Sequence, residues 1–223
     1  MDGIELTNAC EWGRARPSIE VKAPVSNETI MARIDGICKK EFESIKSVSF
    51  SAFFEANFNE LAIGILVGAA SFICLGQFDA VLVHLGGGLG GGSVGPIDYA
   101  IKLAQMPTTL LIGSVKVAFF ALMAFAIPYL EEFAFRGVLY DLMGGDLGDK
   151  VDKALRVLGN AFLFALYHIP AMLPHVSVLL FLEIFILGAI LATLRATTEG
   201  RVASTAAHIT YNSLIFATIF ALA

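Results

Sequence analysis

Three ionisable side chains gather in the stretch PYLEEFAFRGVLY, residues 128–140, which follows a long apolar run. In an α-helix, Glu132 and Arg136 lie one turn apart on the same face and can form an ion pair. Glu131 points about 100° away and keeps its carboxylate free of that partner. A charge at the centre of a bilayer costs roughly 2.5–3.5 kcal/mol, so such residues usually face the protein interior. Charges at a helix end would be solvated instead, but the apolar residues on both sides of Arg136 favour an internal site. Pro128 removes a backbone hydrogen bond just before the carboxylates and can open the helix there.

Histidine and asparagine occur in two further apolar stretches. In NAFLFALYHIP, His168 shares a helix face with Phe164 and precedes Pro170. In HITYN, His208 and Asn212 are four positions apart and project from one face. A lone histidine in an apolar helix is more often a core residue than a catalyst, and histidine or asparagine can also join membrane helices by hydrogen bonds. The combination of these groups with the glutamates, rather than any one of them, suggests a site.

A free carboxylate, two imidazoles and an amide on three helices are suited to the activation of water. A poorly solvated carboxylate can accept a proton from water, a neutral imidazole can hold or share that proton, and imidazole or amide donors can stabilise an oxyanion. The sequence contains neither G-x-S-x-G nor H-E-x-x-H. Hydrolysis without a cofactor is therefore the expected chemistry. Zinc held by glutamate and histidine across helices is an alternative, and a proton relay is a third reading.

The composition indicates that these groups lie in a membrane protein. The chain of 223 residues is 57% hydrophobic and 16% charged, with a mean hydropathy of +0.74, whereas soluble domains average about 45–50% apolar and about 25% charged residues. We predict an all-α, polytopic membrane helix bundle of about five to six spans. The apolar runs lie at about residues 61–83, 109–130, 157–173, 178–194 and 202–223.

Two domains follow from the distribution of charge. Residues 1–48 hold seven Lys and Arg and are expected to form a soluble N-terminal extension, with residues 49–223 embedded in the membrane. The distribution of Lys and Arg among the loops places the N-terminus in the cytoplasm. A glycine-rich loop, residues 84–95, contains a formal G-x-G-x-x-G but joins two membrane helices, so we expect a flexible loop rather than a dinucleotide site. A net charge of −5 spread along the chain gives no nucleic-acid footprint.

Three motifs resemble those of a known family. EEFAFRG, residues 131–137, resembles the E-E-x-x-x-R motif of the CPBP family, which comprises CAAX prenyl endopeptidases and bacteriocin-processing proteins. FALYH, residues 164–168, resembles its F-x-x-x-H motif, and HITYN, residues 208–212, its H-x-x-x-N motif. All three occur in the family's order, and the resemblance covers about residues 115–223. The N-terminal extension and the glycine-rich loop match nothing in that pattern.

The resemblance implies the all-helical core of glutamic intramembrane proteases. Glu131 would then be the base that activates water, with His168 assisting it, and His208 and Asn212 would form the oxyanion site. Glu132 and Arg136 would support them as an ion pair that fixes the helix. The expected partners are membrane lipid and a peptide or protein substrate, either prenylated or unprenylated. A non-proteolytic membrane scaffold or immunity protein of the same fold is the alternative function.

Overall fold

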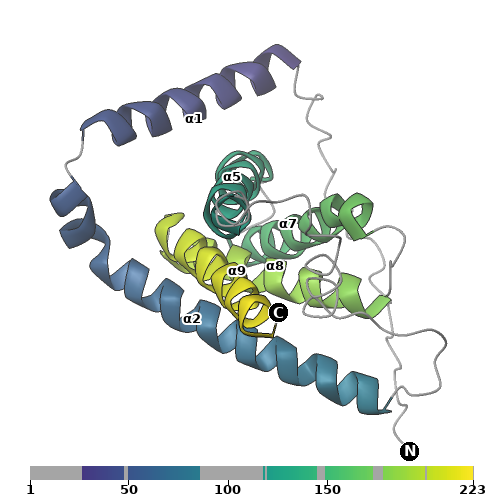
Figure 1. Cartoon of the computed structure of the whole chain (residues 1–223). Coiled ribbons are helices and arrows are strands. Elements are labelled where there is room, and N and C mark those ends of the chain that lie inside the picture. Colours follow the sequence, from purple (N-terminus) through teal and green to yellow (C-terminus); the bar gives the residue numbers. More distant parts are fainter. Residues whose placement is uncertain are drawn as a thin grey trace, which may run out of the picture.

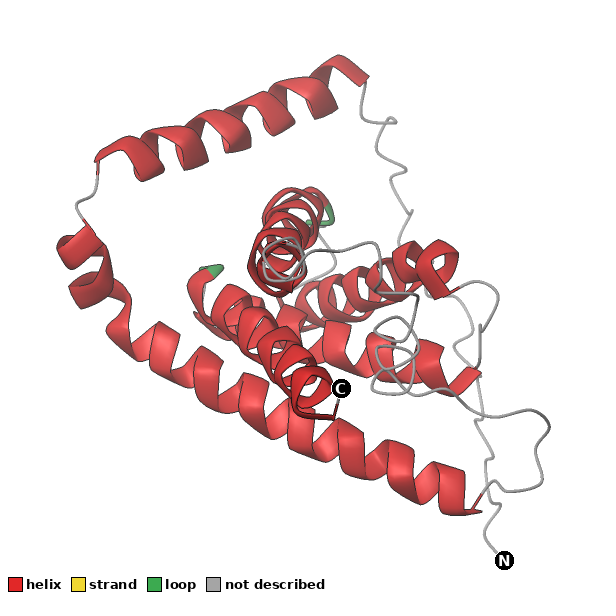
Figure 2. Cartoon of the chain, in the orientation of Figure 1, coloured by secondary structure: helices red, strands yellow, loops and turns green. Residues whose placement is uncertain are grey.

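The computed structural model describes residues 27–47, 50–85, 118, 120–144, 149–172, 178–198 and 200–222. Nearly all of these residues are helical, and no strand occurs among them (Figure 2), which confirms the predicted all-α class. The long helices are α1 (Asn27–Ser47), α2 (Phe50–Leu85), α7 (Asp149–Met172), α8 (Val178–Thr198) and α9 (Val202–Leu222). The glycine-rich loop after Leu85 and the first 26 residues lie outside the described part.

Two of the described helices are long and apolar enough to cross a membrane by length and composition. These segments are Ser51–Gln77 in α2 and Leu180–Thr198 in α8. A count of five to six spans and a cytoplasmic N-terminus remain predictions. Helix α1 falls within the predicted N-terminal extension, and its Arg33 donates a hydrogen bond to the carbonyl oxygen of Asp141 at 3.2 Å.

The glutamate motif lies in a helix that continues well beyond residue 130. This segment, residues 120–142, is called the motif helix below. It is π-helical at Leu122–Ala126 (η2), α-helical at Ile127–Glu132 (α5), π-helical again at Phe133–Leu139 (η3) and α-helical at Tyr140–Leu142 (α6). The helix therefore does not end before the charges. Pro128 sits in the first turn of α5, directly after η2, where a π-helical turn accommodates the missing backbone donor.

Close helix packing in the bundle depends on small residues. Helix α9 lies along α2 (Figure 1), with Gly64 and Gly68 facing Ala203 and Ala207. A methyl group added at Gly64 would meet the carbonyl oxygen of Ala203, and one at Gly68 would meet that of Ala207. The spacing is that of the G-x-x-x-G motif, which lets two membrane helices approach closely. This contact fixes the helix that carries His208 and Asn212.

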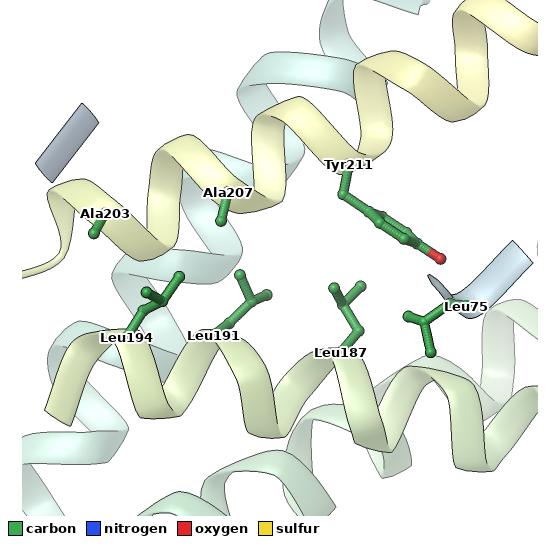
Figure 3. Packing of buried hydrophobic residues seen from close by; sticks show 7 residues of the cluster. All are labelled: Leu75, Leu187, Leu191, Leu194, Ala203, Ala207 and Tyr211. Carbon is green, nitrogen blue, oxygen red and sulfur yellow. The ribbon is translucent and has the colours of Figure 1, made fainter. Parts of the chain in front are cut away.

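A layer of leucines joins α8 to α9. Leu187, Leu191 and Leu194 point from successive turns of α8 toward Ala203, Ala207 and Tyr211 of α9, and Leu75 of α2 completes the cluster (Figure 3). On its other side, α8 packs along α7, where a side chain at Gly188 would come within 3.1 Å of the Ala161 backbone. Helix α8 is thus the central element between α7 and α9, both of which carry a histidine of the site.

Candidate active site

A fully buried ion pair lies at the centre of the motif helix. Glu132 and Arg136 are both 0% exposed, and Arg136 Nη1 lies 3.0 Å from Glu132 Oε1. The guanidinium also donates through Nη2 to the carbonyl oxygen of Gly188 at 3.0 Å, and it lies over the ring of Phe164, 4.3 Å from the ring centroid. A buried charge of this kind persists only when it is paired and hydrogen-bonded. The pair therefore anchors the motif helix to both α7 and α8.

The imidazole of His208 lies between the two carboxylates. Its Nδ1 is 3.1 Å from Glu132 Oε1, and its Nε2 is 3.6 Å from Glu131 Oε2. Because the carboxylate of Glu132 can only accept a hydrogen bond, we assign the Nδ1 proton of His208 to this contact. Its Nε2 then faces Glu131 either as a lone pair in the neutral ring or as a second donor in the imidazolium.

His168 approaches Glu131 from a second helix. Its Nε2 lies 3.6 Å from Glu131 Oε1, and its Nδ1 lies 2.8 Å from the carbonyl oxygen of Phe164. A carbonyl oxygen accepts only, so Nδ1 carries the proton and Nε2 of the neutral ring presents a lone pair toward Glu131. This fixed tautomer is the one required to accept a hydrogen bond from a water molecule near Glu131.

Glu131 is thus flanked by an imidazole nitrogen on each side. Both separations of 3.6 Å exceed hydrogen-bond length, and three groups that can all act as acceptors need a shared donor between them. A water molecule bridging the carboxylate and an imidazole would supply it. Glu131 is 8% exposed, so the group is largely desolvated while a path to it exists.

Three successive turns of α7 face the motif helix. Asn160 donates through Nδ2 to the carbonyl oxygen of Phe135 at 2.6 Å, Phe164 packs on Arg136, and His168 reaches Glu131. These residues recur at every fourth position, which places them on one side of an α-helix. The ring centroid of Phe164 also lies 4.5 Å from that of His168. The aromatic ring therefore separates the ion pair from the His168 side of the site.

Asn212 lies one turn beyond His208 on the same face of α9. Its Nδ2 is 3.5 Å from the carbonyl oxygen of Met123, at the long limit of a hydrogen bond. That carbonyl belongs to η2, in which the amide of Ile127 bonds the carbonyl of Leu122 instead. The next possible backbone donor would be residue 128, which is proline. The amide of Asn212 therefore serves a carbonyl without an available backbone donor and keeps a second hydrogen for another acceptor.

The structure brings Glu131, Glu132, Arg136, His168 and His208 together and places Asn212 against the same helix. Among the described residues Arg136 pairs with Glu132, and His208 contacts both glutamates, a contact that the spacing of the motif residues did not predict. Sequence reasoning overlooked the structural part of Asn160, although it stands four positions before Phe164 on the same helix face. It also gave no role to the backbone of Gly188, for which the sequence offered no signal.

An apolar groove lies along the N-terminal half of the motif helix. It has a volume of about 580 Å³. It is lined by Ala121, Leu122, Phe125, Ala126 and Tyr129 of the motif helix, by Ala118 just before it, and by Ile209 of α9. Tyr129 stands two positions before Glu131, and Ile209 follows His208 directly, so the groove is formed by the same two helices that carry these site residues. Its lining can accept an apolar chain but offers little hydrogen bonding.

Within the part of the chain that the structure describes, no group of three or more histidine, cysteine, aspartate and glutamate side chains has the arrangement of a metal site. In particular, His208 directs both of its ring nitrogens toward carboxylates.

Comparison with known proteins identifies one family. Residues 113–214 match the model of the family described as "Type II CAAX prenyl endopeptidase Rce1-like". The matched segment contains all three motifs and every residue of the cluster, and the match confirms the resemblance drawn from the motifs. No curated protein and no solved structure matches the chain significantly.

Proposed function

Because residues 113–214 match the model of the Rce1-like family of type II CAAX prenyl endopeptidases, we propose that the protein is an intramembrane endopeptidase. It would hydrolyse a peptide bond near the membrane surface with a water molecule activated by Glu131 and His168. Proteins of this family are integral membrane proteins, and the two apolar helices accord with that location. The observation that carries the proposal is the position of Glu131 between two imidazole Nε2 atoms at 3.6 Å.

In the first step, the water oxygen attacks the scissile carbonyl carbon while one of its protons passes to Glu131. His168 accepts a hydrogen bond from the same water through Nε2 and orients it. Glu131 then delivers the proton to the amine nitrogen as the carbon–nitrogen bond breaks. A single carboxylate can serve as base and then as acid in this way because its surroundings are desolvated on one side and polar on the other.

The oxyanion formed by this attack needs donors. His208 provides Nε2–H when the ring is protonated, and Asn212 provides its second amide hydrogen. The carboxylate of Glu132, held at 3.1 Å from Nδ1, orients the ring and stabilises the imidazolium. A buried aspartate does the same for the histidine of serine proteases. Glu132 would therefore act on the reaction through His208 while it also pairs with Arg136.

The substrate class follows from the surroundings of the site. A peptide or protein whose apolar chain lies in the groove along residues 118–129 would bring a nearby peptide bond to Glu131. A prenylated C-terminal peptide has this combination, which accords with the family description. Membrane lipid would surround the groove when it is empty. We expect no nucleic-acid partner, because the net charge of −5 is spread along the chain and gives no basic footprint.

The proposal is tested by cleavage of prenylated and unprenylated peptides by the purified protein in lipid nanodiscs, with products identified by mass spectrometry. Glu131→Gln should abolish cleavage. The matched control is Glu183→Gln, which makes the same change at a glutamate of α8 that is 1% exposed and is no part of the proposed mechanism. It should retain cleavage. Equal rates for wild type and Glu131→Gln would contradict the proposal.

Two alternatives give different results in the same assay. If the protein is a scaffold or immunity protein, Glu131→Gln keeps its cellular function although neither form cleaves peptides. If the chemistry depends on zinc, a strong chelator stops cleavage and added zinc restores it. We expect cleavage to survive chelation, because the residues of the cluster can perform each step without a metal.

A further inference from the structure

Two carbonyl groups in the middle of the motif helix accept hydrogen bonds from side chains of other helices. The carbonyl oxygen of Phe135 accepts from Asn160 Nδ2 at 2.6 Å, and that of Arg136 accepts from Arg195 Nε at 3.0 Å. Backbone carbonyls inside a regular α-helix are already bonded by the amide four positions later. The two side-chain donors therefore mark a place where the regular bonding pattern changes.

That change is the return from the π-helix η3 to the α-helix α6. The amide of Tyr140 bonds the carbonyl of Phe135, five positions back, whereas the amide of Met143 bonds that of Leu139, four positions back. A helix that passes from the first pattern to the second skips one carbonyl. Of the three carbonyls between these bonds, that of Gly137 is also contacted by the Tyr140 amide and that of Arg136 accepts the side-chain donor Arg195 Nε, so we infer that the skipped group is the carbonyl of Arg136. Arg195 supplies the donor that the backbone does not.

Helix α8 forms hydrogen bonds with both the side chain and the backbone of Arg136. The carbonyl of Gly188 accepts from the Arg136 guanidinium, and Arg195, two turns later on α8, donates to the Arg136 carbonyl. The guanidinium in turn pairs with Glu132, and Glu132 contacts the His208 imidazole. A direct series of contacts thus runs from Arg195 to the catalytic group, although Arg195 is no part of the three motifs.

We propose that Arg195 is a positioning residue of the active site. Through its hydrogen bond to the Arg136 carbonyl it stabilises the π-helical form of η3, and this form sets the places of Glu132 and His208. Without the donor, the amide of Tyr140 would shift to the free Arg136 carbonyl, and η3 would become α-helical. Glu132 and Arg136 could still pair in an α-helix, but loss of one inserted residue turns the two halves of a helix against each other by about 100°. That turn would move the pair away from the Gly188 carbonyl of α8 and from the His208 imidazole.

An ordinary surface ion pair is the alternative role for Arg195. Its Nη2 lies 2.9 Å from Asp141 Oδ1, and its guanidinium lies 5.3 Å from the ring centroid of Tyr140. In that case the charge of the side chain would matter and its Nε–H would not. The two roles can be separated because they use different atoms.

The test compares Arg195→Gln with Arg195→Met. Glutamine carries its amide nitrogen at the position along the side chain that Nε has in arginine, so it keeps the donor and removes the charge. Methionine has a methyl group there and removes both. Asp141→Asn serves as a further control, since it removes the ion pair and leaves the Nε–H donor in place.

The proposal builds on the proposed protease function, so cleavage and structure are measured separately. Arg195→Met should lower kcat about 10–100-fold with KM within about threefold of wild type, the range typical of outer supporting residues. Arg195→Gln and Asp141→Asn should keep kcat within about threefold. Equal losses in Arg195→Gln and Arg195→Met would overturn the positioning role and assign Arg195 to the ion pair. Should Arg195→Met not fold, Arg195→Gln decides alone: near wild-type kcat supports the proposal, and a loss equal to that of Glu132→Gln overturns it.

Hydrogen exchange of residues 133–142, measured by mass spectrometry, needs no substrate. Exchange in Arg195→Met should be about tenfold faster than in wild type, and in Arg195→Gln it should equal wild type. This pattern in a protein that cleaves none of the peptides would contradict the protease function and leave the role of Arg195 in η3 intact. Unchanged exchange in Arg195→Met would overturn that role even if the protein is a protease.

Discussion

Substitution of Arg136 and substitution of Glu131 should differ in their effects on stability. Arg136→Met removes the ion pair with Glu132, the hydrogen bond to the Gly188 carbonyl and the contact with the Phe164 ring. It leaves the carboxylate of Glu132, which is 0% exposed, without a cationic partner and with the neutral donors His208 and Ser204 as its polar contacts. Breaking one side of a buried pair costs about 3–5 kcal/mol. For a protein of this size that corresponds to a fall in Tm of roughly 6–20 °C.

Glu131→Gln should cost far less. The new amide has the same shape as the carboxylate, and the contacts to His168 and His208 are too long at 3.6 Å to be hydrogen bonds. We expect a loss of free energy of unfolding below about 1 kcal/mol, or roughly 2–4 °C in Tm. Thermal unfolding of both variants in one detergent, followed by circular dichroism, measures the difference.

A double variant separates loss of the pair from loss of packing. Adding Glu132→Gln to Arg136→Met removes the unpaired charge and should recover part of the lost stability. Equal falls in Tm for Glu131→Gln and Arg136→Met would refute the division between a catalytic and a supporting glutamate. A double variant whose loss of stability equals the sum of the losses of Glu132→Gln and Arg136→Met would refute the stabilising ion pair between the two side chains.

Three further changes test the packing around the site and its donors. Gly68→Ala places a methyl group against the Ala207 carbonyl and should lower the free energy of unfolding by about 1–3 kcal/mol. Cleavage should fall in the same preparation. Gly36→Ala is the control, because nothing lies within 4 Å of an added methyl group there, and it should not lower Tm. Phe164→Leu removes the ring that covers the Arg136 guanidinium and should lower Tm by the equivalent of about 1–2 kcal/mol, and an unchanged Tm would refute the contact. Asn212→Ala should lower kcat about 10²–10³-fold with little change in KM, whereas a change confined to KM would place Asn212 in substrate binding.

Much of the arrangement can be predicted from local sequence patterns. Apolar runs define the helices, and the spacing of four positions predicts the pairing of Glu132 with Arg136. The same spacing places His208 and Asn212 on one face of α9. The G-x-x-x-G spacing of Gly64 and Gly68 was also available, and it would have indicated the close approach of α2 to α9.

The π-helical turns could not be predicted in the same way. An ideal α-helix places Glu131 and Glu132 about 100° apart, and their common contact with His208 depends on the position of α9. Whether a helix adopts a π-turn depends on donors from other helices, here Asn160 and Arg195, which are remote in sequence from Phe135 and Arg136. Such tertiary contacts have no local signature. The number of membrane spans and the orientation of the chain also stay predictions, because they depend on segments outside the described residues.

The most direct measurement of the central claim is a double-mutant cycle on kcat/KM with Glu131→Gln, His168→Phe and the two combined. If both side chains activate the same water, either change alone removes that activation, and the double variant should be about as slow as the slower single variant. Losses that multiply in the double variant would show that Glu131 and His168 act independently and would contradict a shared site.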